Sequence, residues 1–470
     1  MAYPFFGRRD RDVIGSDAPD AFYVGRYFDP ETGRVGPKLQ MPGTEPIIII
    51  GRNRSGKDSG IGIYNGLRLQ NRSLVWVDPR GEGGAVCLPY RKKLGLTSCL
   101  NPMGVLLGTP GYEDLQSDGW AALAELAASD PALFDQVAGY AEALIKLESK
   151  DPHWSVRSRG VMAGLMMHEV IDADGIRTPL LANGRELLTE GDEFDQNGEP
   201  IKGLVATARA LVQQGNPQIA SLMGSFTVDN DETRSVRATA DGNTLFLLSQ
   251  PMRDDEAKNG FRMASLGNKP TSLFLIMPHD MVQADSIHAP FLRLVVSAAL
   301  RSLYRPTKTV TTFYLNEFAA LGRLQAVEAA LGLVAGYGIQ LVIVVQSLTQ
   351  LRQLYEHAWE NFLGQAGAVV LVGAPADKFT AEYLSARAGD MTIRQPNAGL
   401  QLNAGGVGMS SGEGYTRRRY LMPHDLFDVQ PGYGYVWVAG LGNAIPAYYP
   451  PYWDVDQLRR RARHNPYYRG

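Results

Sequence analysis

The feature that most constrains this chain is a glycine-rich stretch between an apolar run and a helix-forming segment. The stretch reads Gly51-Arg-Asn-Arg-Ser-Gly-Lys-Asp58, after the apolar run 47–50 and before 59–69. A strand, a glycine-rich bend and a helix form the context that a phosphate-binding loop needs. Backbone N–H groups, the helix N-terminus and Lys57 would then face bound phosphates. A chance match in a glycine-rich chain is the alternative interpretation.

The loop therefore predicts a nucleotide site, with ATP and Mg²⁺ as its expected ligands. The residues that we expect to bind the nucleotide are Gly51, Asn53, Arg54, Ser55, Gly56, Lys57, Asp58 and Ser59. One position departs from the pattern GxxxxGK[ST], because Asp58 stands where a hydroxyl normally ligates Mg²⁺.

Composition limits where the protein works and what it contacts. A chain of 470 residues has room for two or three domains, and its net charge of −3 provides no overall basic field for nucleic acid. Cys87 and Cys99 are too few for a disulfide framework, which fits a reducing cytoplasm. We find no signal peptide in 1–30, and the longest apolar stretch, 331–345, is shorter than the roughly 20 residues of a membrane helix. We expect a cytoplasmic protein that reaches the inner membrane only through partners.

The order of the apolar runs predicts an α/β fold with a mostly parallel sheet flanked by helices, because strands and helices alternate. Strands are expected at 47–50, 73–77, 244–248, 272–277, 309–315, 340–345, 369–372 and 433–439, and helices at 59–69, 289–303 and 321–333. The glycine- and asparagine-rich segment 396–414 is expected to be a mobile loop.

A helical block interrupts this pattern. Helical spacing and alanine-rich faces predict helices at 120–128, 131–149, 156–173, 203–215 and 217–226. We therefore divide the chain into a β-rich arm (1–45), a nucleotide-binding domain (46–107 and 241–450), an inserted all-α domain (108–240) and a basic tail (451–470).

A second motif, Phe313-Tyr-Leu-Asn-Glu317, places polar residues at the end of an apolar strand. In the Walker B arrangement, a first acid holds the magnesium shell and a second polarises the attacking water. Here Asn316 stands at the first position and Glu317 at the second. Gln346, which ends the next strand, is placed to sense the γ-phosphate. We predict Glu317 and Gln346 as catalytic residues, and Asp58 and Asn316 as the residues that hold Mg²⁺.

Several cations could contribute from outside this site. Arg323, Arg387 and Arg394 could reach a neighbouring subunit's γ-phosphate, or could be solvated or structurally paired. The basic clusters 417–419 and Arg459, Arg460, Arg461 and Arg463 could contact a phosphate backbone or a membrane-side partner, or form a solvated face. We predict no histidine metal site, and expect His153 to take part in helical packing.

Longer stretches resemble the type IV secretion coupling proteins of the TraG type. The resemblance rests on GRNRSGKDSG (51–60), VWVDPRGE (75–82), LNPMG (100–104), the block from LNEFAALGRL to VVQSLTQL (315–351) and RRYLMPHDLFDVQPGYGYVWVAG (418–440). It implies a RecA-like P-loop ATPase related to FtsK and HerA. It also implies a homo-hexameric ring that passes DNA–relaxase complexes or effector proteins to a secretion channel. The helices around 152–154 would belong to the domain that engages this cargo.

The chain departs from the family pattern at three points: no N-terminal membrane helices are found, and Asp58 and Asn316 replace the usual residues. Two functions therefore remain open, a ring ATPase that drives or gates translocation and a docking platform that binds ATP without hydrolysing it. Asp58 and Asn316 are either a compensated exchange or a sign that hydrolysis has decayed. Whether the cargo is DNA or protein also stays open, as does a monomeric state in dilute solution.

Overall fold

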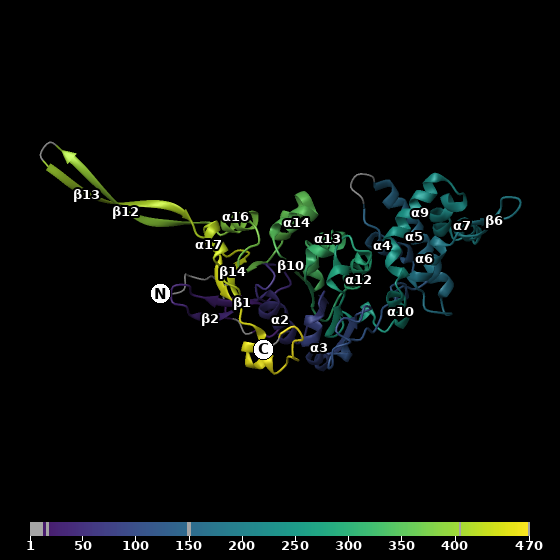
Figure 1. The fold of residues 1–470 in the computed structure, drawn as a ribbon, viewed down its shortest axis with the longest axis horizontal. Coiled ribbons are helices and arrows are strands. Elements are labelled where there is room, and N and C mark those ends of the chain that lie inside the picture. Colours follow the sequence, from purple (N-terminus) through teal and green to yellow (C-terminus); the bar gives the residue numbers. More distant parts are fainter. Residues whose placement is uncertain (1–12, 16–17, 148–151, 404–405, 469–470) are drawn as a thin grey trace. The chain divides into compact units, whose positions relative to one another are not determined.

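The computed structural model describes residues 13–15, 18–147, 152–403 and 406–468. The chain forms two compact units, and each is built from separate stretches of sequence. Unit 1 comprises Met1–Asn65 and Val344–Asp456, and unit 2 comprises Gly66–Ile343 and Gln457–Gly470. Figure 1 labels their helices and strands.

Unit 1 contains a six-stranded part of the sheet in which β3 and β11 are parallel. The strands are β1 (Phe22–Phe28), β2 (Val35–Met41), β3 (Ile47–Gly51), β11 (Ala368–Val372), β14 (Tyr433–Val438) and β15 (Ile445–Tyr448), in the order β2-β1-β15-β14-β11-β3. Val372 lies opposite Gly51 in the parallel pair, and the other pairs are antiparallel. Both β3 and β11 are buried throughout, as expected for continuous apolar runs covered on both faces.

The helices of unit 1 follow its strands. A π-helical turn, Asp58–Gly62, leads into α2 (Ile63–Arg68), and the others are α14 (Leu348–Tyr355), α15 (Trp359–Gly364), α16 (Lys378–Arg387) and α17 (Pro423–Phe427). The carboxylate of Asp377 accepts the backbone N–H of Thr380 and so caps the start of α16.

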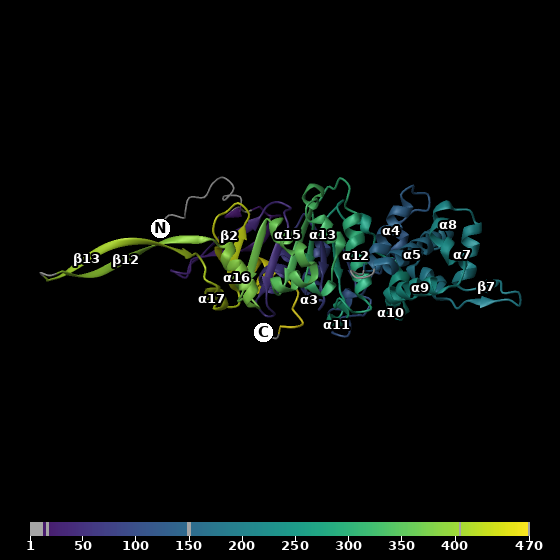
Figure 2. The same ribbon diagram turned by 90° about the horizontal axis from the view of Figure 1, so that it is seen from above.

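The expected mobile loop at 396–414 is instead an antiparallel hairpin. Strands β12 (Asp390–Asn403) and β13 (Gly406–Arg419) pair along their whole length, and residues 404 and 405 at the tip lie outside the described residues. Figures 1 and 2 both show the hairpin extending away from α16 and α17. The prediction was wrong because backbone pairing between strands holds a ribbon even where glycine and asparagine dominate the composition.

Unit 2 contains the parallel part of the sheet. Its strands are β4 (Ser73–Val77), β5 (Leu96–Leu100), β8 (Thr271–Leu275), β9 (Thr311–Leu315) and β10 (Ile339–Val345), in the order β10-β9-β4-β8-β5, and neighbours are parallel. The last two residues of β10 belong to unit 1. The helices of this part are α3 (Glu82–Leu94), α11 (His279–Val282), α12 (Ala289–Arg301), α13 (Gln325–Ala330) and α18 (Asp456–Arg459). The predicted α/β class with mostly parallel strands is confirmed.

A helical block belongs to unit 2 as well. It comprises α4 (Leu133–Leu144), α5 (Pro152–Ala173), α6 (Leu181–Thr189), α7 (Leu204–Gln213), α8 (Pro217–Met223), α9 (Asp231–Thr244) and α10 (Gln250–Lys258), with a short ribbon of β6 (Glu193–Phe194) and β7 (Pro200–Lys202). Helix α5 is its centre, because α4, α6, α8 and α9 all pack on it. Val161, Leu165 and Met166, in the middle of α5, are fully buried.

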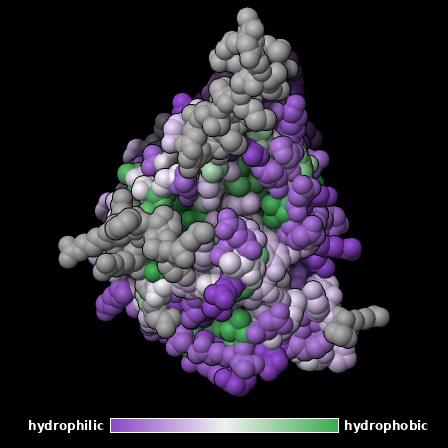
Figure 3. Space-filling view, turned by 90° about the vertical axis from the view of Figure 1, so that its left-hand side faces the viewer, coloured by the Kyte–Doolittle hydropathy of each residue, from purple (hydrophilic) through white to green (hydrophobic). Residues whose placement is uncertain are grey.

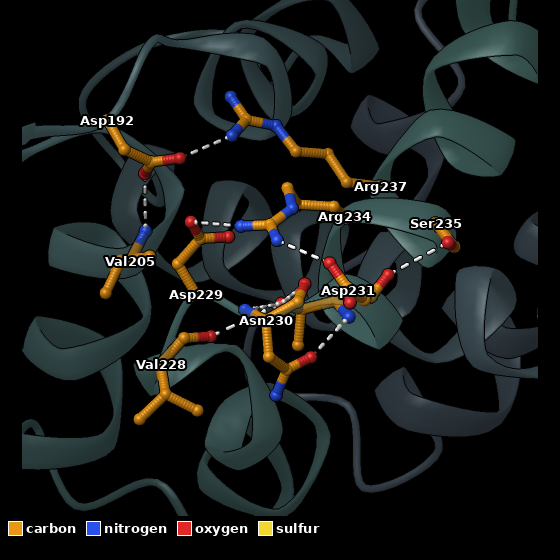
Figure 4. Close-up of polar contacts among 10 residues, drawn as sticks. Asp192, Val205, Val228, Asp229, Asn230, Asp231, Arg234, Ser235 and Arg237 are labelled. Carbon is orange, nitrogen blue, oxygen red and sulfur yellow. Dashed lines mark hydrogen bonds and ion pairs between the residues drawn. The ribbon is translucent and has the colours of Figure 1, made fainter.

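Polar contacts fix the start of α9, as Figure 4 shows. Asn230 accepts the N–H of Thr233, and the Thr233 hydroxyl accepts the N–H of Asn230. Arg234 donates to Asp229 and Asp231, which lie on either side of this cap. The paired caps satisfy backbone donors that the first helical turn would otherwise leave without a partner.

Three expected elements were wrong or too long. The strand expected at 244–248 is a 3₁₀ turn, Leu245–Leu248, and the helix expected at 120–128 is reduced to the 3₁₀ turn Leu123–Glu125. The helix expected at 321–333 shortens to α13. Short apolar or alanine-rich runs fit more than one backbone conformation, so packing against neighbouring elements decides between them.

The segment 457–468 belongs to unit 2 and packs on α3 and the turn before it. Arg463 donates to the carbonyl of Ala85 and to the carboxylate of Asp114, and Arg461 donates to the carbonyl of Leu67. Asn465 donates to Glu82. Contacts within the chain therefore account for Arg461 and Arg463, two of the basic residues of the tail.

Polar residues dominate the surface shown in Figure 3, where hydrophobic residues form only small, separate patches. Among the described helices, none is long and apolar enough to cross a membrane.

Candidate functional site

The predicted phosphate loop of unit 1 has the backbone that its sequence requires. It leaves β3 at Gly51 and turns through positive φ at Arg54 (62°) and Gly56 (97°) before the π-helical turn begins. A Cβ at residue 51 would lie 2.7 Å from the Ser55 hydroxyl and 3.1 Å from the Val372 carbonyl oxygen. Glycine is therefore required at residue 51, and the left-handed backbone at residue 56 favours glycine as well.

The side chains of the loop place one cation and one anion next to each other. Lys57 is buried, with 4% of its side chain exposed, and its Nζ lies 3.9 Å from Oδ2 of Asp58. Asp58 begins the helical segment, where a carboxylate interacts favourably with the positive end of the helix dipole. The Ser55 hydroxyl is buried and has no hydrogen-bond partner among the described residues. The loop thus holds both a buried ammonium and a buried hydroxyl.

Residues far along the chain hold this loop in place, and sequence reasoning missed them. The N–H of Gly432 donates to the carbonyl of Ser55 (2.9 Å), and the N–H of Tyr449 donates to the carbonyl of Gly432 (2.7 Å). A Cβ at Gly60 would lie 2.9 Å from Tyr449, and one at Gly373 would lie 3.1 Å from Ser55 Cβ. The glycines in QPGYG and LVGAP were the available signal in the sequence.

The second predicted motif lies in unit 2, at the end of β9. Asn316 and Glu317 are both half-buried, and Glu317 adopts a left-handed backbone (φ 53°, ψ 42°). The side-chain oxygen of Asn316 accepts the N–H of Glu317 at 3.2 Å. The turn is therefore held by the amide at the position where an acid was expected. A non-glycine residue in this conformation is strained, and such strain is concentrated at functional sites.

Two further polar residues, Asp78 and Asn101, follow strands β4 and β5 of unit 2. Val77 of β4 pairs with Leu315 of β9, so Asp78 and Asn316 follow their strands at the same level. The carboxylate of Asp78 is buried and accepts the N–H of Gly84, which fixes the turn into α3. Asn101, after β5, donates to the carbonyls of Val105 and Leu115. Both residues therefore stabilise the turns that carry the DPRGE and LNPMG sequences.

The remaining predicted residues are spread over both units. Gln346 follows β10 in unit 1, is half-buried, and its backbone N–H donates to Oε1 of Gln350. Arg323 in unit 2 forms an ion pair with Glu328 (3.1 Å), and Arg387 in unit 1 donates to the carbonyl of Leu363. The side chain of Arg394 lies outside those that the structure describes.

The sequence analysis predicted that His153 takes part in helical packing, but its side chain lies at the surface. Half of its side chain is exposed, its ring contacts Trp154 edge-on, and its Nε2 lies 3.3 Å from the carboxylate of Glu232. The contact with Glu232 makes it part of a surface ion pair when it is protonated.

The two halves of the predicted site thus have distinct chemical capacities. The loop of unit 1 offers backbone donors, a buried ammonium and a carboxylate, which suit phosphate oxygens and a divalent cation. The turn after β9 in unit 2 offers a carboxylate, Glu317, in a fixed backbone position, which suits orientation of a water molecule.

Comparison with known proteins agrees with the fold and the motifs. Residues 6–442 match the family model for type IV secretory system conjugative DNA transfer. The conjugal transfer protein TraG of Escherichia coli is 24% identical over 406 residues, covering 81% of this chain and 61% of TraG. The protein VirD4 of Agrobacterium fabrum is 34% identical over 212 residues, covering 43% of this chain and 30% of VirD4.

The chain thus spans less than two thirds of the length of both relatives. Among solved structures, the bacterial conjugative coupling protein TrwBdeltaN70 has the same fold, with a TM-score of 0.64 at 17% identity over 93% of this chain and 89% of that one. TrwB in complex with ADP and Mg²⁺ gives a TM-score of 0.62 at 18% identity, covering 88% of this chain and 87% of that one. The chain therefore belongs to the family of type IV secretory system conjugative DNA transfer proteins, the coupling proteins.

Proposed function

We propose that this protein is a coupling ATPase that binds ATP with Mg²⁺ and delivers a substrate to a type IV secretion channel. The observation that carries the proposal is the loop 51–59. It combines positive φ at Arg54 and Gly56, a buried Lys57, and closure by the N–H of Gly432 on Ser55. In this arrangement the ammonium of Lys57 would neutralise the β- and γ-phosphates, and the loop N–H groups would hold the β-phosphate.

The residues present fit a bound Mg²⁺ at one of the two predicted positions better than at the other. Asp58 supplies a carboxylate oxygen, the type of ligand that Mg²⁺ prefers, in the first turn after the loop. Asn316 offers a neutral amide oxygen that already accepts the N–H of Glu317. We infer that Asp58 is the direct ligand and that Asn316 acts on the metal only through water. Bound Mg²⁺ would neutralise charge on the β- and γ-phosphates.

Glu317 would orient the water that attacks the γ-phosphate, and Gln346 would sense that phosphate. The carboxylate of Glu317 can accept a proton from the water, since its position is set by a strained and hydrogen-bonded turn.

The decisive test compares Lys57→Ala with Lys378→Ala. Lys57 is buried in the loop, whereas Lys378 belongs to the same unit and has 82% of its side chain exposed. Binding of a fluorescent ATP analogue should weaken by at least about 100-fold for Lys57→Ala, because a buried charge-assisted contact is lost. Lys378→Ala should bind as the natural protein does. Equal affinity of the folded Lys57→Ala variant would contradict the proposal.

The substrate and partners follow from the same proposal. We propose that residues 108–240 engage DNA–relaxase complexes or effector proteins, that the nucleotide-binding domain comprises 46–107 and 241–450, and that 1–45 and 451–470 form an arm and a tail. Similarity to the conjugative DNA transfer family and to the conjugal transfer protein TraG supports DNA transfer as the process. A homo-hexamer would complete each ATP site with an arginine from its neighbour, and channel or membrane-anchored proteins would bring the ring to the inner membrane.

A further inference from the structure

A cavity of about 220 Å³ lies in unit 2 where the helical block meets the helices that flank the sheet. It is lined by the end of α4, Arg159 of α5, the side of α12, and α13 with the two residues before it. None of the predicted nucleotide-binding or catalytic residues lines this cavity. It therefore needs an explanation of its own.

The lining of the cavity is strongly cationic. Among the described lining residues, Glu142 is the one acidic side chain and five side chains are basic. The basic residues are Lys146, Arg159, Arg293, Arg301 and Arg323. Arg323 is paired with Glu328, and Glu142 lies 3.6 Å from Arg301. An excess of three positive charges remains after both acids are counted. The chain as a whole is slightly acidic, so this excess is local.

Two of these arginines are fixed to backbone oxygens at the end of α4. Arg293 is 6% exposed and donates to the carbonyls of Ala143 and Leu144, while Arg159 donates to the carbonyl of Ile145. A guanidinium has five N–H donors, so these bonds use only part of its capacity. Burial without an acidic partner lowers the pKa of Arg293 to about 10, and the group keeps its charge at neutral pH.

The cations nearer to solvent are positioned as well. The guanidinium of Arg301 lies over Gly139 of α4, where a Cβ would collide with it. Lys146 and Arg323 are exposed at the rim. Helix capping accounts for Arg293 and Arg159, but it does not account for Lys146, Arg301 and Arg323 around the same hollow.

We propose that this cavity is a phosphate-binding site, distinct from the phosphate loop. Guanidinium groups match the geometry of phosphate oxygens, and an excess of three charges suits a multiply charged group better than a single carboxylate. A volume of about 220 Å³ has room for a phosphate group. The ligand is either a small phosphate compound or the backbone of a nucleic acid strand that passes the rim.

The test measures binding of inorganic pyrophosphate to the full chain carrying Lys57→Ala, so that the phosphate loop cannot contribute. In this background, the pair Lys146→Gln and Arg301→Gln should weaken binding by at least about tenfold, because two of the positive charges around the cavity are lost. The matched control pair is Lys269→Gln and Lys308→Gln, two exposed cations of the same unit that do not line the cavity. The control should leave affinity unchanged.

Gly139→Ala separates binding from folding. Alanine favours the helix by about 1 kcal/mol over glycine, yet its Cβ must displace the guanidinium of Arg301. The variant should therefore lose pyrophosphate affinity without losing thermal stability. Hydrogen exchange at the end of α4 should slow when pyrophosphate binds to the chain with an intact cavity.

Competition experiments identify the source of the phosphate. If a single-stranded oligonucleotide competes with pyrophosphate, and binds more weakly to the Lys146→Gln and Arg301→Gln variant, the ligand is a nucleic acid backbone. An oligonucleotide that does not compete identifies a small phosphate compound. Three results would overturn the proposal: no pyrophosphate binding, equal loss in the control pair, or tighter binding of a glutamate peptide than of pyrophosphate. ATP binding to the natural protein is measured separately, so the two proposals can fail independently.

Discussion

At the residue scale, strained backbone coincides with the predicted chemistry. Of the five non-glycine residues with positive φ among the described residues, two fall in the predicted motifs: Arg54 in the phosphate loop and Glu317 after β9. The left-handed region costs an ordinary residue roughly 1 kcal/mol or more. Glycine, which carries no such cost, is absent from both positions. The side chains of these residues therefore contribute something that a relaxed turn would not.

Glu317 allows stability and activity to be separated. Glu317→Gly should raise the free energy of unfolding by about 1 kcal/mol, because the left-handed backbone is no longer strained. Glu317→Gln keeps the strain, so its stability should match that of the natural protein. Both variants should lose about 100-fold or more in ATP turnover, since the carboxylate that orients water is gone.

Urea unfolding and a phosphate-release assay measure these two quantities. Glu356→Gly, at another left-handed residue, is the control for relief of strain without loss of turnover. Full turnover by Glu317→Gln would remove Glu317 from the proposed mechanism.

Asp58 and Asn316 can be tested as a pair. If they are a compensated exchange, Asp58→Thr and Asn316→Asp should each weaken Mg²⁺-dependent ATP binding, because each changes the site's charge by one unit. The double variant should restore it. If hydrolysis has decayed instead, Asn316→Asp alone should raise turnover in an otherwise unharmed site. Titration with ATP at several Mg²⁺ concentrations distinguishes the two outcomes.

At the element scale, the sequence predicts buried parallel strands well and irregular segments poorly. The expected strand 73–77 matches β4 at both ends, because four apolar residues after Ser73, between polar turns, leave little freedom. The run Leu245–Leu248 is also apolar throughout, but it forms a 3₁₀ turn that directly follows α9. Local pattern could also not predict the Gly432 and Tyr449 contacts on the phosphate loop, which join residues almost 400 positions apart.

The junction of α10 and α6 should make stability depend on pH. The carboxylate of Glu256 in α10 accepts the N–H groups of Leu181 and Ala182 at the start of α6. Burial raises the pKa of Glu256 to about 7, with the charge of Glu169 adding to the rise. The folded state therefore keeps a proton that the unfolded chain releases near pH 4.5, so stability falls as pH rises from about 4.5 to 7.

The loss is on the order of 3 kcal/mol at most. Glu256→Gln should remove this slope, and Glu186→Gln, at an exposed side chain nearby, should retain it. Urea unfolding between pH 4.5 and 8 provides the measurement. An unchanged slope in Glu256→Gln would assign the pH dependence to other groups.

At the scale of the whole molecule, the family assignment raises the question of assembly. A ring needs a head-to-tail interface that closes on itself, and each ATP site would take an arginine from the next subunit. Crosslinking with ATP and single-stranded DNA should produce a ladder that ends near six subunits. A ladder that stops at two under all conditions would contradict the ring, and a monomer without ligands would agree with assembly that depends on them.

The interleaving of the two units has a consequence for synthesis on the ribosome. Translation produces most of unit 2 before the second stretch of unit 1, and 457–470 emerge after both. The start of α3 therefore lacks its contacts with Arg463 and Asn465 until the last stretch of unit 2 has been synthesised. A nascent chain paused before residue 457 should leave this surface open to chaperones, whereas a chain that includes residues 457–468 should not.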